Sequence, residues 1–73
     1  MPFVHVHLVK GVLNDEKKQE LQQRLTDLMT DIEGHEQFRQ LVWVKIDEDE
    51  AANWCIGGEQ VSLEKIKAIL ESA

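Results

Sequence analysis

The chain has 73 residues, 42% of them hydrophobic, and a formal net charge of −6 at pH 7. This charge argues against nucleic acid or an anionic membrane as a partner, because both are polyanions. The single cysteine excludes an internal disulfide, and the sequence shows neither a secretory leader pattern nor an apolar run near about 20 residues. We therefore expect a soluble cytoplasmic protein with one free thiol.

So short a chain buries too little apolar surface to be very stable by itself. We expect residues 1–73 to form a single small domain. Such domains usually need disulfides, a metal ion or oligomerisation as support. One cysteine and three histidines argue poorly for a tetrahedral zinc site. Oligomerisation is therefore the expected support.

Apolar alternation predicts two strands separated by a helix. Residues 3–9 form the first strand, expected to be largely covered on both faces, and Gly11 follows in a turn. One face of this strand carries Val4, Val6 and Leu8. The other face carries Phe3, His5, His7 and Val9. The helix spans residues 15–33, with Asn14 as N-cap and Gly34 just past its end. Its apolar stripe is Leu21, Leu25, Leu28, Met29 and Ile32.

After a polar connector over residues 35–40, residues 41–47 predict the second strand. Val42, Val44 and Ile46 share one face, and Leu41, Trp43 and Lys45 share the other. A strand, a crossover helix and a strand give a β-α-β unit with parallel strands. Two strands do not make a sheet that is stable alone, so a second copy of the chain should complete it.

The remaining residues predict an acidic loop, a hairpin and a short helix. Residues 47–50 are all acidic and are expected to be solvated. Gly57-Gly58 predicts a tight hairpin within residues 54–61. Ser62 caps a helix over residues 63–71.

Pro2 is the most unusual candidate for chemistry. A small residue after the initiator methionine normally allows Met1 to be removed, which leaves proline as an N-terminal secondary amine. An α-amine has a pKa of about 7.7–8, and desolvation beside Phe3 and Trp54 favours its neutral form. Such a group is a candidate general base, or a nucleophile toward a carbonyl. The alternative is a proline that only begins an edge strand, and with Met1 retained Pro2 has no basic nitrogen.

Three features together resemble the 4-oxalocrotonate tautomerase family, over residues 2–62. Pro2 follows the initiator methionine and opens a strand, and Gly11 leads from that strand into a long helix. After the second strand comes Trp54-Cys55-Ile56-Gly57-Gly58-Glu59, an aromatic residue closely followed by Ile-Gly-Gly-Glu. The resemblance implies the tautomerase fold, with a β-α-β subunit, a C-terminal hairpin and short helix, and a sheet completed by oligomerisation.

The resemblance also implies an assembly and an activity. Subunits would pair into a four-stranded sheet, and dimers would assemble as a hexameric trimer of dimers. The implied enzyme is a tautomerase, an isomerase that needs no cofactor. Pro2 would act as general base on a small enol or 2-oxo acid, and Trp54 would wall the pocket.

The chain departs from the family pattern where substrate carboxylates are bound. The family's arginine after the glycine is replaced here by Val12-Leu13, and the arginine inside the second strand is replaced by Trp43. Lys45 lies on the same strand face as Trp43 and is a candidate replacement cation; Lys10 is a weaker one. The predicted site thus has Pro2 as catalytic residue and Lys45, Trp54 and Trp43 as substrate-binding residues.

Other polar side chains have structural interpretations. His5 and His7 share a strand face and are a possible metal pair, but nothing in the sequence places a third ligand such as His35. We expect them to be interior or interface histidines, with no metal bound. Cys55 lacks an adjacent base and is expected to be a buried structural thiol.

Two hypotheses for function remain open. The first is a tautomerase that depends on Pro2 and acts on a small carbonyl compound. The second is a non-catalytic oligomer of tautomerase fold that serves as a ligand-binding or assembly module, since the usual arginines are absent. A cation close to Pro2 favours the first hypothesis.

Overall fold

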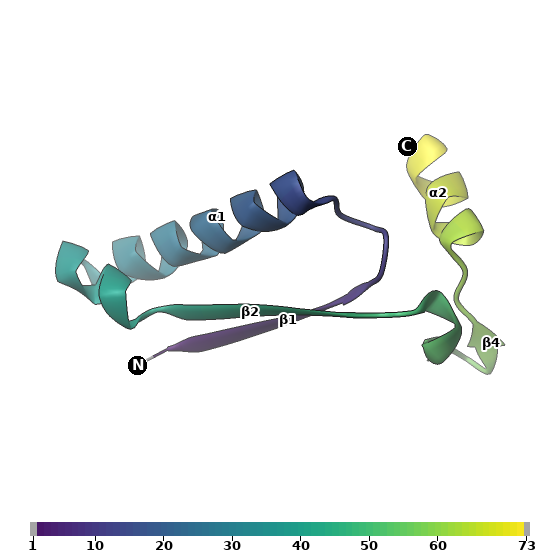
Figure 1. The fold of residues 1–73 in the computed structure, drawn as a ribbon, viewed down its shortest axis with the longest axis horizontal. Helices are drawn as coiled ribbons and strands as arrows, with labels where there is room; N and C mark the ends of the chain where they lie inside the picture. The colour runs from purple at the N-terminus through teal and green to yellow at the C-terminus, as the bar shows by residue number, and fades with distance from the viewer. Residues whose placement is uncertain (1, 73) are drawn as a thin grey trace.

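The computed structural model describes residues 2–72 (Figure 1). Its elements, in chain order, are β1 (Phe3–Val9), α1 (Asp15–Glu33), the 3₁₀-helix η1 (Glu36–Leu41), β2 (Trp43–Asp49), the 3₁₀-helix η2 (Ala51–Asn53), β3 (Cys55–Ile56), β4 (Glu59–Gln60) and α2 (Leu63–Glu71). β1 and β2 pair in parallel, and β3 pairs with β4 antiparallel. The predicted α/β class and β-α-β architecture are confirmed.

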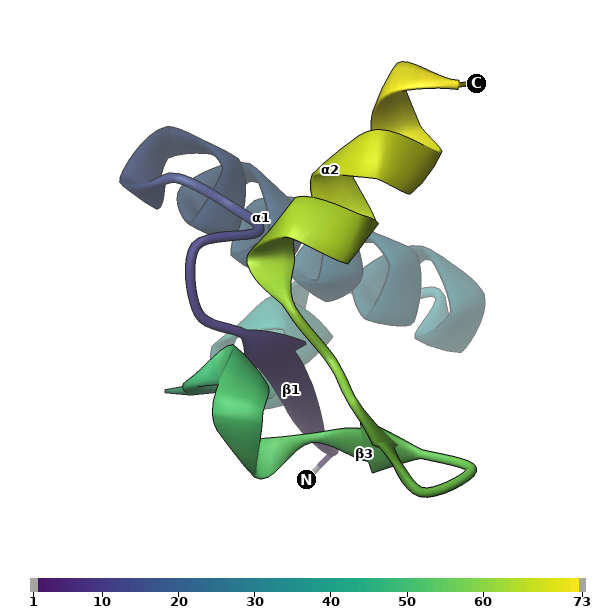
Figure 2. The same cartoon turned by 90° about the vertical axis from the view of Figure 1, so that its right-hand side faces the viewer.

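The β1–β2 sheet has one covered face and one open face. α1 lies along one side of the sheet (Figures 1 and 2). Val4, Val6 and Val44 are half-buried and alternate with exposed neighbours, and Ile46 on the same face is half-buried as well. The other side, which we call the open face, carries Phe3, His5, His7, Trp43, Lys45 and Asp47. The prediction that both faces of β1 are covered is therefore wrong for the single chain, because α1 covers one side only.

Both ends of α1 form as predicted. The Asn14 side chain accepts a hydrogen bond from the Lys17 backbone N–H at 2.8 Å. Gly34 has φ 102°, a left-handed conformation that favours glycine, and its N–H donates to the Thr30 carbonyl at 2.9 Å.

The apolar stripe predicted for α1 is only partly correct. Leu28 and Ile32 are 53% and 75% exposed, whereas Thr30 is the buried residue of the helix at 3%. The Thr30 hydroxyl donates to the Thr26 carbonyl at 2.7 Å, so its burial leaves no unpaired donor. The buried face of α1 thus contains Thr30, whereas Leu28 and Ile32 lie outside that face.

β2 lies later in the chain than predicted. It begins at Trp43 rather than at position 41, because η1 extends through Leu41 and the Val42 N–H still bonds the Arg39 carbonyl at 3.3 Å. It ends at Asp49 rather than at position 47, where the Lys10 N–H donates to the Asp49 carbonyl at 2.8 Å.

The acidic run is therefore not the solvated loop that we predicted. Asp47, Glu48 and Asp49 belong to β2. Glu48 faces α1 and forms an ion pair with Lys18, and only about a fifth of the Glu48 side chain is exposed. Glu50, outside the strand, lies 3.4 Å from the Lys10 ammonium group. These partners hold most of the run in the sheet.

The hairpin and α2 lie at the end of the sheet away from the N-terminus (Figures 1 and 2). Gly57 and Gly58 have φ 60° and 89°, as the predicted tight turn requires. The Ser62 hydroxyl caps α2 by accepting from the Lys65 N–H at 3.2 Å. Cys55 is exposed, so the prediction of a buried thiol is wrong. Its strand is two residues long and pairs with β4 alone.

Large apolar side chains remain open to solvent in this chain. None of the hydrophobic residues among residues 2–72 is fully buried. Those most exposed include Phe3, Ile32, Trp43, Ile56, Ile69 and Leu70. A two-stranded sheet with such surfaces is what a subunit presents when other copies complete the core. Neither helix of the described chain has the length and apolar character needed to cross a bilayer.

Candidate active site

Pro2 is held at the head of β1 by a backbone contact. The Trp43 N–H donates to the Pro2 carbonyl at 3.0 Å, and Pro2 is half-buried. Phe3, the next residue, lies opposite Trp43 in the parallel register. The start of β2 therefore fixes the position of the Pro2 backbone.

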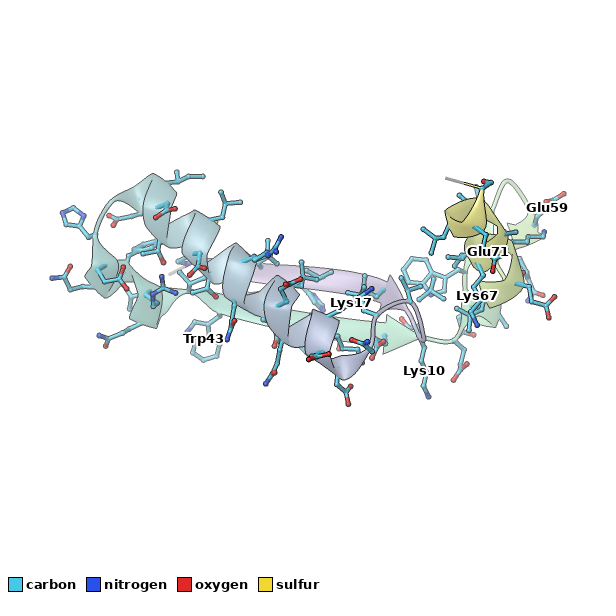
Figure 3. All side chains as sticks on the ribbon, turned by 90° about the horizontal axis from the view of Figure 1, so that it is seen from above. Lys10, Lys17, Trp43, Glu59, Lys67 and Glu71 are labelled. Carbon is cyan, nitrogen blue, oxygen red and sulfur yellow. The ribbon has the colours of Figure 1, made fainter. Side chains whose placement is uncertain are left out.

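A hollow of about 540 Å³ lies beside this contact. It is lined by Phe3, Val42, Trp43, Val44 and Lys45. The Phe3 and Trp43 side chains are 59% and 62% exposed. Figure 3 shows the Trp43 ring reaching out past the edge of the ribbon. The hollow is thus an open, largely apolar surface next to Pro2.

Lys45 supplies a positive charge to the hollow. Its ammonium nitrogen lies 3.7 Å from Asp47 Oδ2, and its side chain is 60% exposed. In the parallel register, Lys45 lies opposite His5 of β1. The cation predicted to replace the lost arginines therefore lies beside Trp43, as strand alternation requires, but a carboxylate already accompanies it.

Trp54 does not reach this hollow within one chain. Pro2 lies at the beginning of the sheet, whereas Trp54 follows η2 beyond the end of β2 (Figure 1). A seven-residue strand at about 3.3 Å per residue puts roughly 20 Å between the two ends of the sheet. The Trp54 indole N–H is buried without a hydrogen-bond partner among residues 2–72. Trp43 contacts Pro2 through the backbone and shares the hollow with Lys45, whereas Trp54 lies apart from all three.

Lys10, the weaker candidate, and Arg39 are engaged elsewhere. Lys10 lies at the far end of β1, beside Glu50. Arg39 bonds Glu36 at 2.8 Å and Asp27 at 2.7 Å, and these carboxylates raise the pKa of Arg39 above its ordinary value. Lys45 is thus the cation that lines the hollow.

Two residues on the open face were not predicted as parts of a site. Phe3 lines the hollow, and Asp47 lies opposite His7 and bonds the His5 Nε2 atom. The hydrogen bond from His5 holds the pKa of Asp47 below its ordinary value. Asp47 has the same strand parity as Trp43, so the strand predicted over residues 41–47 already contained the signal that places it on the open face.

The model of the tautomerase family, described as a tautomerase enzyme, matches residues 2–64. The chain belongs to the tautomerase family. The predicted resemblance is thereby confirmed, and with it tautomerase, or isomerase, activity in general. A curated relative, probable tautomerase K2 of Dickeya dadantii strain 3937, is 39% identical over 62 residues, which span 85% of this chain and 90% of the relative.

Solved structures agree with this assignment. The crystal structure of DmpI from Helicobacter pylori is 34% identical, with a TM-score of 0.69 over 82% of this chain and 95% of that one. The structure of apo unFused 4-OT is 25% identical, with a TM-score of 0.72 over 82% and 93% of the two chains. A protein solved in a study of trans-3-chloroacrylic acid dehalogenase activity, 23% identical with a TM-score of 0.69 over 84% and 100%, shares the fold.

Proposed function

We propose that this tautomerase uses Pro2 as its general base, after removal of Met1 exposes the proline nitrogen as a secondary amine. The observation that supports the proposal is the Trp43 N–H bond to the Pro2 carbonyl, which fixes the head of β1 beside the hollow. A neutral amine in this position accepts a proton from the substrate and, as an ammonium group, returns it to another atom. No cofactor is needed for such a transfer.

The charges around the hollow favour a small substrate with a single negative charge. Lys45 is a point charge and lacks the two-pronged geometry with which arginine binds a carboxylate. Asp47 at 3.7 Å also offsets part of its field. We propose an enol or 2-oxo acid with one carboxylate and an apolar group that contacts Phe3 and Trp43. A dicarboxylate would leave one carboxylate without a cationic partner.

The proposed working form is a homo-oligomer, most simply a hexamer built as a trimer of dimers. A second copy would complete the two-stranded sheet and cover apolar residues that one chain leaves exposed. We further propose that the Trp54 indole of a neighbouring copy reaches the hollow. This arrangement reconciles the predicted role of Trp54 with its distance from Pro2 in the same chain.

The test combines intact mass with ketonisation of phenylenolpyruvate, a simple enol with one carboxylate. We expect the purified protein to lack the mass of one methionine residue and to accelerate ketonisation weakly. The matched control is the same sequence behind an uncleaved N-terminal extension, which turns the Pro2 nitrogen into an amide. We expect this control to be inactive. Equal activity in the two forms would overturn the assignment of Pro2.

The alternative is a non-catalytic member of the family. The observation that favours it is that Val12-Leu13 and Trp43 stand where the family that the chain resembles has its substrate-binding arginines. An assembled, correctly processed protein with no activity on neutral or anionic enols would support this alternative.

A further inference from the structure

We propose that His5, His7 and Asp47 form a binding site for a divalent transition-metal ion such as Zn²⁺, which links β1 to β2. Their potential ligand atoms, a ring nitrogen from each histidine and a carboxylate oxygen, all lie within 4.8 Å of one another. The site does not depend on Pro2 or on the proposed tautomerase chemistry.

The parallel register creates this cluster. His7 lies directly opposite Asp47, and His5 is two residues earlier on the same face of β1. The His5 ring stacks on Phe3 with centroids 5.7 Å apart, and the two imidazole rings have centroids 4.0 Å apart. Zinc binds histidine nitrogen and carboxylate oxygen at about 2.0–2.2 Å, which places tetrahedral ligands roughly 3.3 Å from one another. Small side-chain rotations reach that spacing from the present one.

The ligand chemistry fits a metal of the first transition row. Imidazole suits zinc, copper, nickel and iron, and two histidines with one carboxylate leave at least one position for water. The carboxylate of Asp47 supplies negative charge to the site. Lys45, with its ammonium group 3.7 Å from Asp47, is the competing cation. A metal ion has to displace it from that carboxylate.

A metal in this place would act on stability. The ligands come from both strands, so the ion would pin the pairing of a sheet that has only two strands in each chain. No hydrophobic side chain among residues 2–72 is fully buried, and small domains with limited cores are often supported by a structural metal. An ion that binds the folded chain but not the unfolded chain stabilises the folded state by mass action.

The experiment titrates metal-free, full-length protein with ZnCl₂ by calorimetry and follows its melting temperature. Wild type should bind one ion per chain with micromolar or tighter affinity and melt at a higher temperature with zinc. His7→Gln and Asp47→Asn should each weaken binding at least about tenfold and abolish the thermal shift. The matched control is His35→Gln, which removes a histidine that bonds Glu33 outside the sheet. This variant should bind like wild type.

Binding weaker than millimolar in wild type would overturn the proposal. So would zinc affinity that is unchanged in both His7→Gln and Asp47→Asn, or lost equally in His35→Gln. Circular dichroism of each metal-free variant checks that it is folded. If a variant fails to fold, Co²⁺ added to wild type provides a second test, because visible absorption bands of a site with nitrogen ligands should appear. Their absence contradicts the site.

Discussion

We propose that Lys45 is the residue that binds the substrate carboxylate in this tautomerase. It places a positive charge in the hollow next to Trp43, on the strand whose first N–H group holds the Pro2 carbonyl. A lysine side chain is flexible and exposes its ammonium group, so it can follow a substrate carboxylate. Asp47 competes for the same ammonium group. We therefore expect modest affinity for anionic substrates.

Replacing Lys45 with alanine should raise KM for phenylenolpyruvate several-fold, up to about tenfold, because one charge-assisted hydrogen bond is lost. It should also move the acidic limb of kcat/KM to higher pH. Removal of a nearby positive charge makes an ammonium group harder to deprotonate, and the general base acts in its neutral form. Steady-state kinetics across pH measure both effects.

Lys10→Ala is the matched control, since this lysine lies beside Glu50 at the far end of β1. It should leave KM and the pH profile as in wild type. If Lys45→Ala also leaves both unchanged, Lys45 is only a solvated residue of the strand.

Among the elements, α1 and β2 are joined by a largely shielded ion pair. The Lys18 ammonium group donates to Glu48, and the two side chains are 25% and 20% exposed. The hydrogen bond to Glu48 is the main reason that the pKa of Lys18 lies above its ordinary value of 10.5. This pair anchors the acidic end of β2 under the first turns of α1.

Lys18→Met should lower the melting temperature at pH 7 and leave the Glu48 carboxylate without its partner. A raised pKa means that the stabilisation by Lys18 is fully present below pH 10.5, the ordinary pKa of lysine, and declines as the pH rises through the higher pKa of the folded state. The difference in melting temperature between wild type and variant should therefore shrink in strongly alkaline buffer.

The control for this pair is Lys17→Met, the neighbouring exposed lysine of the same helix (labelled in Figure 3). Its melting temperature should stay close to that of wild type. If the difference in melting temperature between Lys18→Met and wild type persists at alkaline pH, the ion pair is not the cause of that difference.

The elements that the sequence predicted well are those set by local chemistry. Alternation fixed β1, the Asn14 and Gly34 caps fixed α1, and the glycine pair fixed the hairpin turn. The bounds of β2 depend instead on tertiary partners, namely Lys18 for Glu48 and the Lys10 N–H for Asp49. No local pattern reveals these partners, so the sequence alone predicts a loop for the acidic run.

In the candidate site, too, only the features that depend on local pattern could be predicted from the sequence. Strand parity put Trp43 and Lys45 on one face, and the register then placed Trp43 opposite Phe3, with its N–H on the Pro2 carbonyl, and Lys45 opposite His5. Asp47 could be joined to His5 and His7 only after the register was known. The position of Trp54 relative to the hollow depends on a second chain in our proposal, which alternation within one chain does not describe.

At the scale of the whole molecule, exposed apolar surface is the main evidence for assembly. The hairpin and α2 extend past the sheet (Figure 1). On α2, Ile69 and Leu70 are 70% and 64% exposed, and Ile56 on β3 is 77% exposed. Burial of such side chains against other copies would supply the core that one chain lacks.

Sedimentation equilibrium should find wild type as an oligomer, most simply a hexamer, at micromolar concentration. Ile69→Glu should shift it toward smaller species, because a buried unpaired charge opposes association. Lys67→Glu is the matched control on the same helix (labelled in Figure 3), since it alters charge without removing apolar surface. It should assemble like wild type. A stable, folded wild-type monomer would contradict the proposed assembly.

The role of Pro2 as general base is tested most directly by kcat/KM for phenylenolpyruvate in wild type and in Pro2→Ala, with Met1 removal confirmed by mass in both. Alanine retains an N-terminal amine but loses the ring that fixes its position. We therefore expect a loss of roughly 10- to 100-fold with sedimentation and circular dichroism unchanged. Full activity in Pro2→Ala, in a protein that folds and assembles like wild type, would contradict the role of Pro2 as the general base.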